Sequence, residues 1–307
     1  MSASLSPSQD SRGTSMGICN GRTVIITGAG GGLGREYALA FAGEGAAVVV
    51  NDIRHDAAQA VCDEIARRGG RALANSDDIT RVDTAQRIVD AARAAFGDVH
   101  VLVNNAGICR DKMFTSMTET DWDDVMRVHL RGHFCLSSVL ARAWRDAAKA
   151  GNPVDARIVN TSSGAGLQGS IGQSNYGAAK AGIAALTLMQ AAELQRYGVR
   201  VNALAPAART SMTEGVFADM MKKPEDGGFD YFDPANVAPL VVWLGSVQSA
   251  DVTGQVFEVA GGMIAVAEGW RTGPRVDRGA RWAAAEVGPA VAQLLADARS
   301  AQRVYGS

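Results

Sequence analysis

Short runs of apolar, often β-branched residues alternate along the chain with longer segments in which apolar residues recur at helical spacing. Residues 22–27 (RTVIIT) and 46–51 (AAVVVN) are almost entirely apolar, as strands covered on both faces are. Residues 33–44, between them, show helical periodicity. A strand, a helix and a strand in this order form a βαβ unit, which requires parallel strands and a right-handed crossover.

The same alternation continues to residue 259. We expect further strands at residues 71–75, 99–104, 157–161, 199–203 and 255–259, and helices at 80–95, 118–148, 175–196 and 234–245. Two helix starts are well marked, by a capping-box pattern at Thr118 and Asp121 and by Asp233 before Pro234. Seven strands with helices between them predict one α/β domain with a doubly wound, parallel seven-stranded sheet, the Rossmann fold.

The ends of the chain and one internal segment do not follow this alternation. Residues 1–20 are rich in serine and lack both a basic start and an apolar stretch, which predicts a disordered leader and no signal peptide. The predicted domain spans residues 21–265, and residues 266–307 form a weakly patterned C-terminal extension with a helix near 289–303. Residues 207–233 are irregular, and a long loop of this kind is typically a lid or binding segment; it carries Met212, Phe217, Met220, Met221, Phe229, Tyr231 and Phe232.

Composition narrows the class of partner. Of the 307 residues, 47% are hydrophobic and 20% charged, which is ordinary for a globular protein. A net charge of −2 provides no basic field for nucleic acid or an anionic membrane, and no apolar run reaches the roughly 18 residues of a membrane helix. The four cysteines form no C-x-x-C pair and accompany no histidine cluster, which indicates reduced thiols in a cytoplasmic protein and no metal site.

A glycine-rich turn follows the first strand and opens the first helix. Its candidate binding residues are Gly28, Gly32, Leu33 and Gly34. Glycines allow a sharp turn and close approach of the backbone to a pyrophosphate, and the helix N-terminus offers free N–H groups and the positive end of its dipole. A glycine-rich turn alone is often only a turn, but the strand before it and the helix after it are the context of a dinucleotide site.

Asp52 ends the second strand, and a carboxylate there can accept hydrogen bonds from both adenosine ribose hydroxyls. It would repel a 2′-phosphate, so the sequence predicts NAD rather than NADP. The alternative is that Asp52 only caps the next helix. Arg54 lies two residues later, but the order Asp then Arg favours NAD.

Tyr176 and Lys180 stand four residues apart, on one face of a predicted helix. Ser163 follows the fifth strand, at the carboxyl edge where ligands bind in such sheets. The serine hydroxyl can hold a substrate oxygen, the tyrosine can act as acid or base, and neighbouring positive charge favours its phenolate. Taken singly, a Tyr-x-x-x-Lys pair is more often a surface feature, and a serine before Gly164 more often a turn residue.

These motifs, in this order, resemble the short-chain dehydrogenase/reductase family over about residues 20–265, although Pro206-Ala207 departs from the family's usual Pro-Gly. The resemblance implies that adenine contacts Asp78 and Ile79, and that Asn105, Ala106 and Gly107 line the cofactor, as do Tyr176 and Lys180. Asn104 can equally be structural, by tying neighbouring strands. His129 stands where the family usually has an asparagine, at an irregularity in the long helix that anchors a proton-relay water. It is expected to join the relay or, alternatively, only to cap a helix bend.

Within the family, segments such as 128–132 (VHLRG) and 237–244 (VAPLVVWL) resemble the (3R)-hydroxyacyl-CoA dehydrogenase part of multifunctional enzyme type 2 of β-oxidation. The resemblance implies an acyl-CoA thioester as substrate, with Lys222 and Lys223 as candidates for CoA phosphates, and a homodimer or homotetramer. Two alternatives remain open: a hydroxysteroid dehydrogenase with the same chemistry, and a non-catalytic cofactor-binding protein, against which the complete Ser163, Tyr176 and Lys180 set argues.

Overall fold

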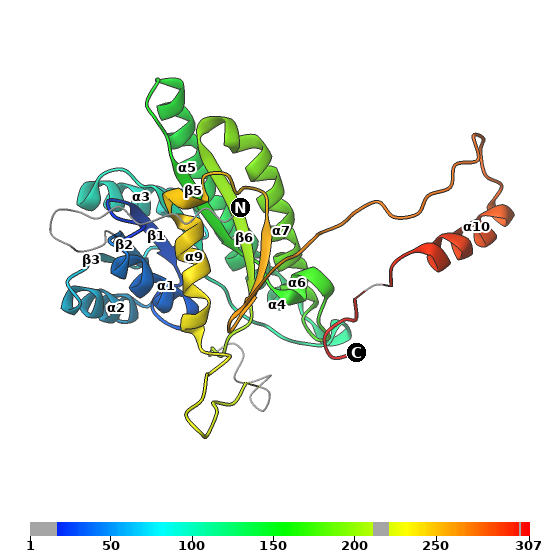
Figure 1. The fold of residues 1–307 in the computed structure, drawn as a ribbon, viewed down its shortest axis with the longest axis horizontal. Coiled ribbons are helices and arrows are strands. Elements are labelled where there is room, and N and C mark those ends of the chain that lie inside the picture. Colours follow the sequence, from blue (N-terminus) through cyan, green and yellow to red (C-terminus); the bar gives the residue numbers. More distant parts are fainter. Residues whose placement is uncertain (1–16, 211–220, 301) are drawn as a thin grey trace, which may run out of the picture.

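The computed structural model describes residues 17–210, 221–300 and 302–307, and it confirms the doubly wound parallel sheet (Figure 1). The strand order is β3-β2-β1-β4-β5-β6-β7-β8. The strands are β1 (Thr23–Thr27), β2 (Ala47–Asn51), β3 (Arg71–Asn75), β4 (Val101–Asn104), β5 (Ala156–Thr161), β6 (Val199–Pro206), β7 (Val256–Ala260) and β8 (Met263–Val266). The first seven are parallel, as predicted, and β8 pairs antiparallel with β7 through a hairpin.

Helices cover both faces of the sheet. One face packs against α1 (Gly32–Gly43), α2 (His55–Arg67) and α9 (Ala238–Gly245), and the other against α3 (Val82–Phe96), α5 (Gly132–Lys149) and α7 (Ser174–Leu194). Alternate strand residues enter opposite layers: Val24 and Ile26 lie in the first core, and Ile25 lies in the second. All three are fully buried, which explains why the strands are nearly all apolar.

The predicted long helix 118–148 consists of three parts. The capping box is confirmed, because Asp121 N–H donates to Thr118 Oγ1 (3.2 Å) and Thr118 N–H to Asp121 Oδ2 (3.0 Å). Helix α4 (Glu119–Met126) then leads into a π-helical turn, η2 (Arg127–Arg131), before α5 begins. A π-helical turn widens the helix by one residue and frequently marks a functional site.

The ends of the chain differ from the predicted boundaries. Cys19 is fully buried in the core and its N–H donates to Glu44 O, so the packed domain includes residues 17–20, which were assigned to the leader. In the extension, α10 (Ala284–Asp297) begins before the expected position and has no buried residue. After it the chain returns to the domain, where Tyr305 O accepts a hydrogen bond from Ile171 N–H (3.0 Å) (Figure 1). Met212, Phe217 and Met220 of the predicted lid lie outside the described residues.

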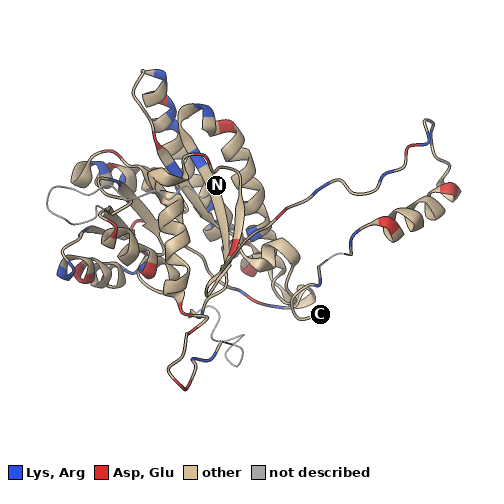
Figure 2. Ribbon diagram, viewed as in Figure 1, with Lys and Arg blue, Asp and Glu red and all other residues tan. Residues whose placement is uncertain are grey.

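The surface charge is mixed. Acidic and basic residues are interspersed on the surface helices (Figure 2). No helix within the three described ranges is both long and apolar enough to cross a bilayer.

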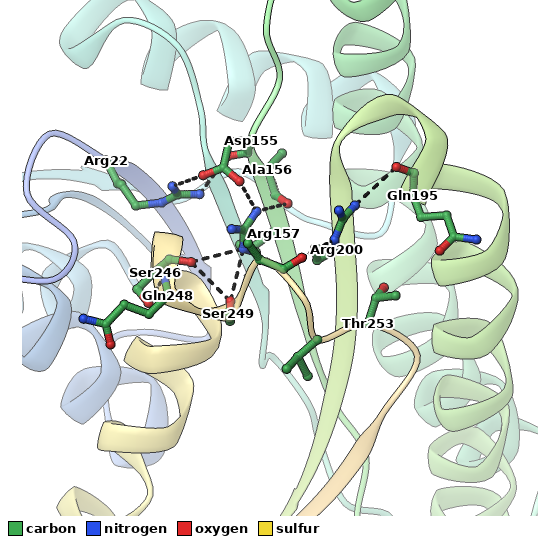
Figure 3. Close-up of polar contacts among 12 residues, drawn as sticks. Arg22, Asp155, Ala156, Arg157, Gln195, Arg200, Ser246, Gln248, Ser249 and Thr253 are labelled. Carbon is green, nitrogen blue, oxygen red and sulfur yellow. Dashed lines mark hydrogen bonds and ion pairs between the residues drawn. The ribbon is translucent and has the colours of Figure 1, made fainter. Parts of the chain in front are cut away.

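An ionic cluster holds the amino edge of the sheet together (Figure 3). The carboxylate of Asp155 accepts hydrogen bonds from Arg22 Nη1 (2.7 Å) and Arg157 Nη1 (2.5 Å), and Arg157 Nε donates to Ser246 O (3.1 Å). Both arginines are buried, whereas the aspartate is half exposed. This cluster ties β1 and β5 to the loop after α9, at the opposite edge of the sheet from the candidate catalytic residues.

Asp155→Asn should lower the unfolding free energy by about 1–3 kcal/mol at pH 7, because two buried guanidinium groups lose their carboxylate. Burial tends to raise the pKa of Asp155, but the hydrogen bonds from Arg22 and Arg157 hold it below the ordinary 3.8. The stabilisation therefore exists above that value and disappears as pH falls through the lowered pKa. Urea unfolding at neutral and acid pH measures it, with exposed Asp98→Asn as the control; equal stability of wild type and Asp155→Asn at pH 7 would contradict the prediction.

Candidate active site

The glycine-rich turn requires glycine at several positions, through either its backbone angles or close contacts. Gly28 and Gly32 have φ angles of +64° and +52°, a region that favours glycine. Helix α1 starts at Gly32, and a Cβ on Gly34 would lie 2.3 Å from the carbonyl oxygen of Gly28. The first turn of α1 therefore lies directly against the end of β1, with its N-terminus at the carboxyl edge of the sheet, as an anion cradle requires.

Asp52 faces this turn. Its Oδ2 accepts a hydrogen bond from Gly30 N–H (3.0 Å), and its side chain is largely buried. Its Oδ1 accepts from Arg54 N–H (3.0 Å) and pairs with the exposed Arg54 guanidinium (3.3 Å). The carboxylate therefore both orders the start of α2 and stands beside the glycine-rich turn, so the capping role and the ribose role are compatible.

The loop after β4 is fixed to the end of β1 by Thr27, which sequence reasoning did not single out. Thr27 Oγ1 accepts from the N–H groups of Asn105 and Ala106, both at 3.0 Å, and Asn105 Nδ2 donates to Thr27 O (3.0 Å). Asn104 forms a hydrogen bond from Nδ2 to Asn160 Oδ1 (3.0 Å), so it ties β4 to β5. The Asn105, Ala106 and Gly107 run consequently lies at the switch point between β1 and β4, where doubly wound sheets bind their ligands.

Asp78 and Ile79 already make internal contacts. The Asp78 carboxylate accepts from Thr80 N–H and Thr80 Oγ1, both at 2.9 Å. Ile79 is buried in the core beside Gly132, where an added Cβ would meet its Cδ1 at 2.8 Å. The side chains of both residues thus stabilise the start of α3 and its packing on α5.

The structure brings Ser163, Tyr176 and Lys180 together. Ser163 follows β5 and caps the short helix α6 (Gly164–Gln168), an element that the sequence pattern did not indicate; its Oγ accepts from Ala165 N–H (3.2 Å). The same side chain lies close enough to Tyr176 to lower the pKa of its phenol. Lys180 Nζ donates to Thr161 O (2.7 Å) and lies 5.5 Å from the centre of the Tyr176 ring.

Burial shifts the acid–base properties of the two helical residues. It lowers the pKa of Lys180 to about 7. Burial also raises the pKa of Tyr176, although the side chain of Ser163 acts in the opposite direction. Among the protein's own groups desolvation therefore dominates the pKa of Tyr176, and the effect of the positively charged nicotinamide on it stays a prediction.

His129 lies in the π-helical turn, fully buried beside the catalytic candidates. Its ring stands edge-on to Tyr176 with centroids 5.2 Å apart, and a Cβ on Gly107 would collide with it at 2.3 Å. Nε2 lies 2.9 Å from Ile108 N and 2.7 Å from Ile108 O, whereas Nδ1 has no hydrogen-bond partner among the described residues. Burial, together with the Lys180 charge, lowers the pKa of His129 to about 3, so the imidazole is neutral near pH 7.

Asn175, another residue that sequence reasoning missed, fixes the position of Tyr176. It is fully buried, its Oδ1 accepts from Tyr176 N–H (2.7 Å), and its Nδ2 donates to Arg110 O (3.1 Å) and Asp121 O (2.9 Å). The first turn of α7 is thereby attached to α4. The sequence feature that could have identified Asn175 is its position immediately before Tyr176.

A phosphate cradle with a carboxylate beside it, and a tyrosine–lysine–serine set at the same sheet edge, define a dehydrogenase site. Residues 22–221 match the family model for short chain dehydrogenases, and the chain belongs to that family. It is an oxidoreductase acting on CH–OH groups, in a family that typically uses NAD or NADP.

Two curated relatives and one solved structure are similar over most of the chain. Hydroxyacyl-CoA dehydrogenase ChsB1 of Mycobacterium tuberculosis is 48% identical over 250 residues, 79% of this chain and 78% of that protein. Peroxisomal multifunctional enzyme type 2 of Mus musculus is 44% identical over 80% of this chain, which spans only 32% of that relative. A crystal structure of a short chain dehydrogenase from Mycobacterium avium has a TM-score of 0.87 and 54% identity, covering 95% of this chain and 100% of that chain.

Lys180→Met should stabilise the protein relative to wild type below pH 7, with an advantage that decreases between pH 7 and the unfolded lysine value of 10.5. In that window the unfolded chain binds the proton that the folded chain has lost, so wild-type stability rises with pH, by up to about 1.4 kcal/mol per unit. Chemical unfolding across this range measures the slope, with exposed Lys149→Met as the control. A pH-independent difference between Lys180→Met and wild type would refute the assigned ionisation.

Proposed function

We propose that this protein is an NAD-dependent dehydrogenase that oxidises the 3-hydroxyl of (3R)-hydroxyacyl-CoA thioesters. The observation that carries the proposal is the meeting of Ser163, Tyr176 and Lys180 at the sheet edge where Asp52 faces the glycine-rich turn. Two similar proteins, a hydroxyacyl-CoA dehydrogenase and a peroxisomal multifunctional enzyme, support the thioester substrate.

The turn fits NAD, because it has no side chains where the pyrophosphate would lie. The residues proposed to hold the phosphates are Gly28, Gly32, Leu33 and Gly34. Asp52 would accept the ribose hydroxyls, since its Oδ2 already receives the N–H of Gly30 at the turn. Asn105, Ala106 and Gly107 would line the nicotinamide half with Tyr176 and Lys180, and the adenine contacts of Asp78 and Ile79 stay a prediction.

Bound NAD⁺ supplies the hydride acceptor. Ser163 holds the substrate oxygen, and Tyr176, after passing its own proton to neutral Lys180, removes the hydroxyl proton as the carbon–hydrogen bond breaks. Burial lowers the pKa of Lys180 to about 7. The lysine can therefore take up a proton from Tyr176 and release a proton on its other side, toward the protein interior. The alcohol thus loses one hydride and one proton, and the products are a ketone, NADH and H⁺.

His129 is proposed to take part in moving that proton. Its ring touches both Tyr176 and the Gly107 backbone, and Nδ1 is free to bond a water while Nε2 is engaged by Ile108. A neutral imidazole has one donor and one acceptor nitrogen, so it can bridge a water as an asparagine would. The alternative role, as a helix-bend cap, makes no use of the unpaired Nδ1.

Part of the irregular segment 207–233 is proposed to bind the acyl-CoA. The ion pair between Arg209 and Asp230 holds the two ends of the loop together, and Phe229 and Tyr231 expose aromatic surface. The extension is proposed to close the other side, since a Cβ on Gly164 would meet the Tyr305 hydroxyl at 2.8 Å. The homodimer or homotetramer stays a prediction, for which exposed apolar side chains on α5 and α7 are suitable: Phe134, Leu188 and Met189.

Asp52→Ala should weaken NAD⁺ binding and narrow the preference for NAD⁺ over NADP⁺. Two ribose hydrogen bonds to a charged group are lost, each about 1.5–3 kcal/mol, and so is the repulsion of a 2′-phosphate. Kd values for both cofactors measured by fluorescence titration test this. Wild-type protein that binds both cofactors equally would show that the carboxylate serves only the start of α2.

Tyr176→Phe should lower kcat by about 10²–10⁴-fold, the range typical of a lost general acid–base group. The protein should stay folded, because the ring packing is kept. Steady-state kinetics at saturating NAD⁺, with a melting temperature for each variant, make the measurement. Turnover within a few-fold of wild type would exclude the tyrosine from proton transfer.

Matched R and S 3-hydroxyacyl-CoA thioesters should differ strongly in kcat/KM, with the R form preferred. The oxygen is fixed by Ser163 and Tyr176 and the hydrogen by the nicotinamide, so only one enantiomer presents both correctly. NADH formation reports the rate, and a free hydroxysteroid serves as the comparison. Oxidation of the steroid with no turnover of any R thioester would contradict the thioester substrate and favour the alternative, a hydroxysteroid dehydrogenase.

A further inference from the structure

Asn175 forms hydrogen bonds with three segments of the chain through one buried amide. The side chain is fully buried in the first turn of α7, one residue before Tyr176. Its Oδ1 accepts from Tyr176 N–H (2.7 Å), and its Nδ2 donates to Arg110 O (3.1 Å) and Asp121 O (2.9 Å). Arg110 lies in the loop after β4, 65 residues before Asn175, and Asp121 lies in α4, 54 residues before it. The amide therefore connects the tyrosine to two distant parts of the chain.

The orientation of this amide is fixed by its neighbours. An asparagine side chain has an acceptor oxygen and two N–H donors, and Asn175 uses both its oxygen and its nitrogen here. All three partners are backbone groups, which cannot exchange the roles of donor and acceptor. A flip of the amide would place Oδ1 against the carbonyl oxygens of Arg110 and Asp121 in a fully buried site, which is unfavourable. Asn175 is therefore held in one geometry.

The bond to Tyr176 N–H takes the place of an ordinary helix cap. The first N–H groups of a helix have no partner within the helix, and Gln173, at the N-cap of α7, forms no side-chain cap hydrogen bond within the described chain. Asn175 satisfies the tyrosine N–H instead, and Asn175 is itself bound to Arg110 and Asp121. The position of Tyr176 consequently depends on the loop after β4 and on α4, and not only on its own helix.

The loop after β4 is also the loop that is proposed to line the cofactor. It contacts the segment before α7 a second time, because Gln173 Nε2 donates to Asp111 Oδ2 (2.9 Å). That bond ends before the helix begins, whereas the Arg110 carbonyl is connected through Asn175 to the backbone of Tyr176. A change in the order of this loop therefore acts on the tyrosine through one side chain.

We propose that Asn175 is a positioning residue that couples cofactor binding at the loop after β4 to the placement of Tyr176. The inference rests on the proposed function of the site. When the cofactor occupies the site, the Arg110 carbonyl is ordered with its loop, and the Asn175 amide carries this constraint to the first turn of α7. Asn175 exchanges no proton. Its effect on the rate is geometric, because a displacement of about 1 Å at a catalytic group can cost about 100-fold.

Two variants of Asn175 and one matched control test the inference. Asn175→Ala removes all three hydrogen bonds. Asn175→Asp keeps the shape and the acceptor for Tyr176 N–H, but only a protonated carboxyl has an O–H to donate to the two carbonyl groups. Asn202→Ala is the control, because Asn202 is also a buried asparagine. It joins β6 to the loop before β7, with Nδ2 donating to Val252 O (2.9 Å) and Oδ1 accepting from Gln255 N–H (3.1 Å).

The first readout needs no substrate. Deuterium exchange of backbone amides is followed by mass spectrometry with and without NAD⁺, and a melting temperature is measured for each variant. In wild type and Asn202→Ala, NAD⁺ should slow exchange both in the loop after β4 and in the first turn of α7. In Asn175→Ala the loop should be protected as in wild type, while most of the protection of the helix turn is lost. Full protection of both segments in Asn175→Ala would overturn the inference.

The second readout is turnover. Asn175→Ala should lower kcat by about 10- to 100-fold, with KM and the Kd of NAD⁺ within about twofold of wild type. In Asn175→Asp the loss relative to wild type at the same pH should shrink as pH falls, because the protonated carboxyl regains one donor. This pH dependence decides the matter if Asn175→Ala fails to fold, and a loss that does not change with pH then counts against the inference.

A kcat loss in Asn202→Ala as large as that in Asn175→Ala would also overturn the inference, because any buried asparagine would then have the same effect. If wild type oxidises no thioester but the exchange protection differs between the variants as expected, the proposed substrate fails and the positioning role of Asn175 stands.

Discussion

The burial of Lys180 constrains the whole carboxyl edge of this sheet. Its Nζ donates to the carbonyl at the end of β5, and no other residue of the described chain forms a hydrogen bond with that nitrogen. A lysine in this position loses its hydration, and the resulting fall in pKa makes it ready to exchange a proton near neutral pH. Burial likewise raises the pKa of Tyr176, so the protein without ligand favours the neutral phenol. A lower tyrosine pKa therefore requires positive charge from outside the protein, which the proposed NAD⁺ would supply.

The geometry around this lysine comes from close backbone packing. Gly166 shows the constraint most directly, because a Cβ there would lie 2.6 Å from the backbone of Lys180 and Ala181. Helix α6 can therefore lie on α7 only through glycine, and this contact carries Ser163 to the tyrosine. At the glycine-rich turn, Gly34 likewise allows α1 to approach the backbone of Gly28. Both halves of the site thus depend on helices that approach neighbouring backbone more closely than a side chain allows.

The sequence predicted those features that depend on residues close together in the chain. Buried strands are apolar, the glycine-rich turn stands between a strand and a helix, and Tyr176 and Lys180 share a helix face, so these features could be located without coordinates. The features it missed are decided by tertiary contacts. Strand β8 has exposed Met263, Ile264 and Val266 and forms because the hairpin at Gly261 returns it to β7. An irregularity in the long helix was expected from the family resemblance alone, and its π-helical form was not, since no residue type specifies it.

Polar side chains are buried close to Lys180, where they lower stability relative to apolar side chains of the same size. An apolar residue at 133 and a fully paired residue at 129 would remove three of the unpaired nitrogen atoms. Each has the desolvation cost of a buried polar group, and the lysine adds its own. Such a set survives in a fold whose total stability is about 5–15 kcal/mol only if the surrounding core compensates, and the two apolar layers of the sheet do so. The two buried histidines of η2 and α5 therefore place desolvation costs next to a lysine that has a cost of its own.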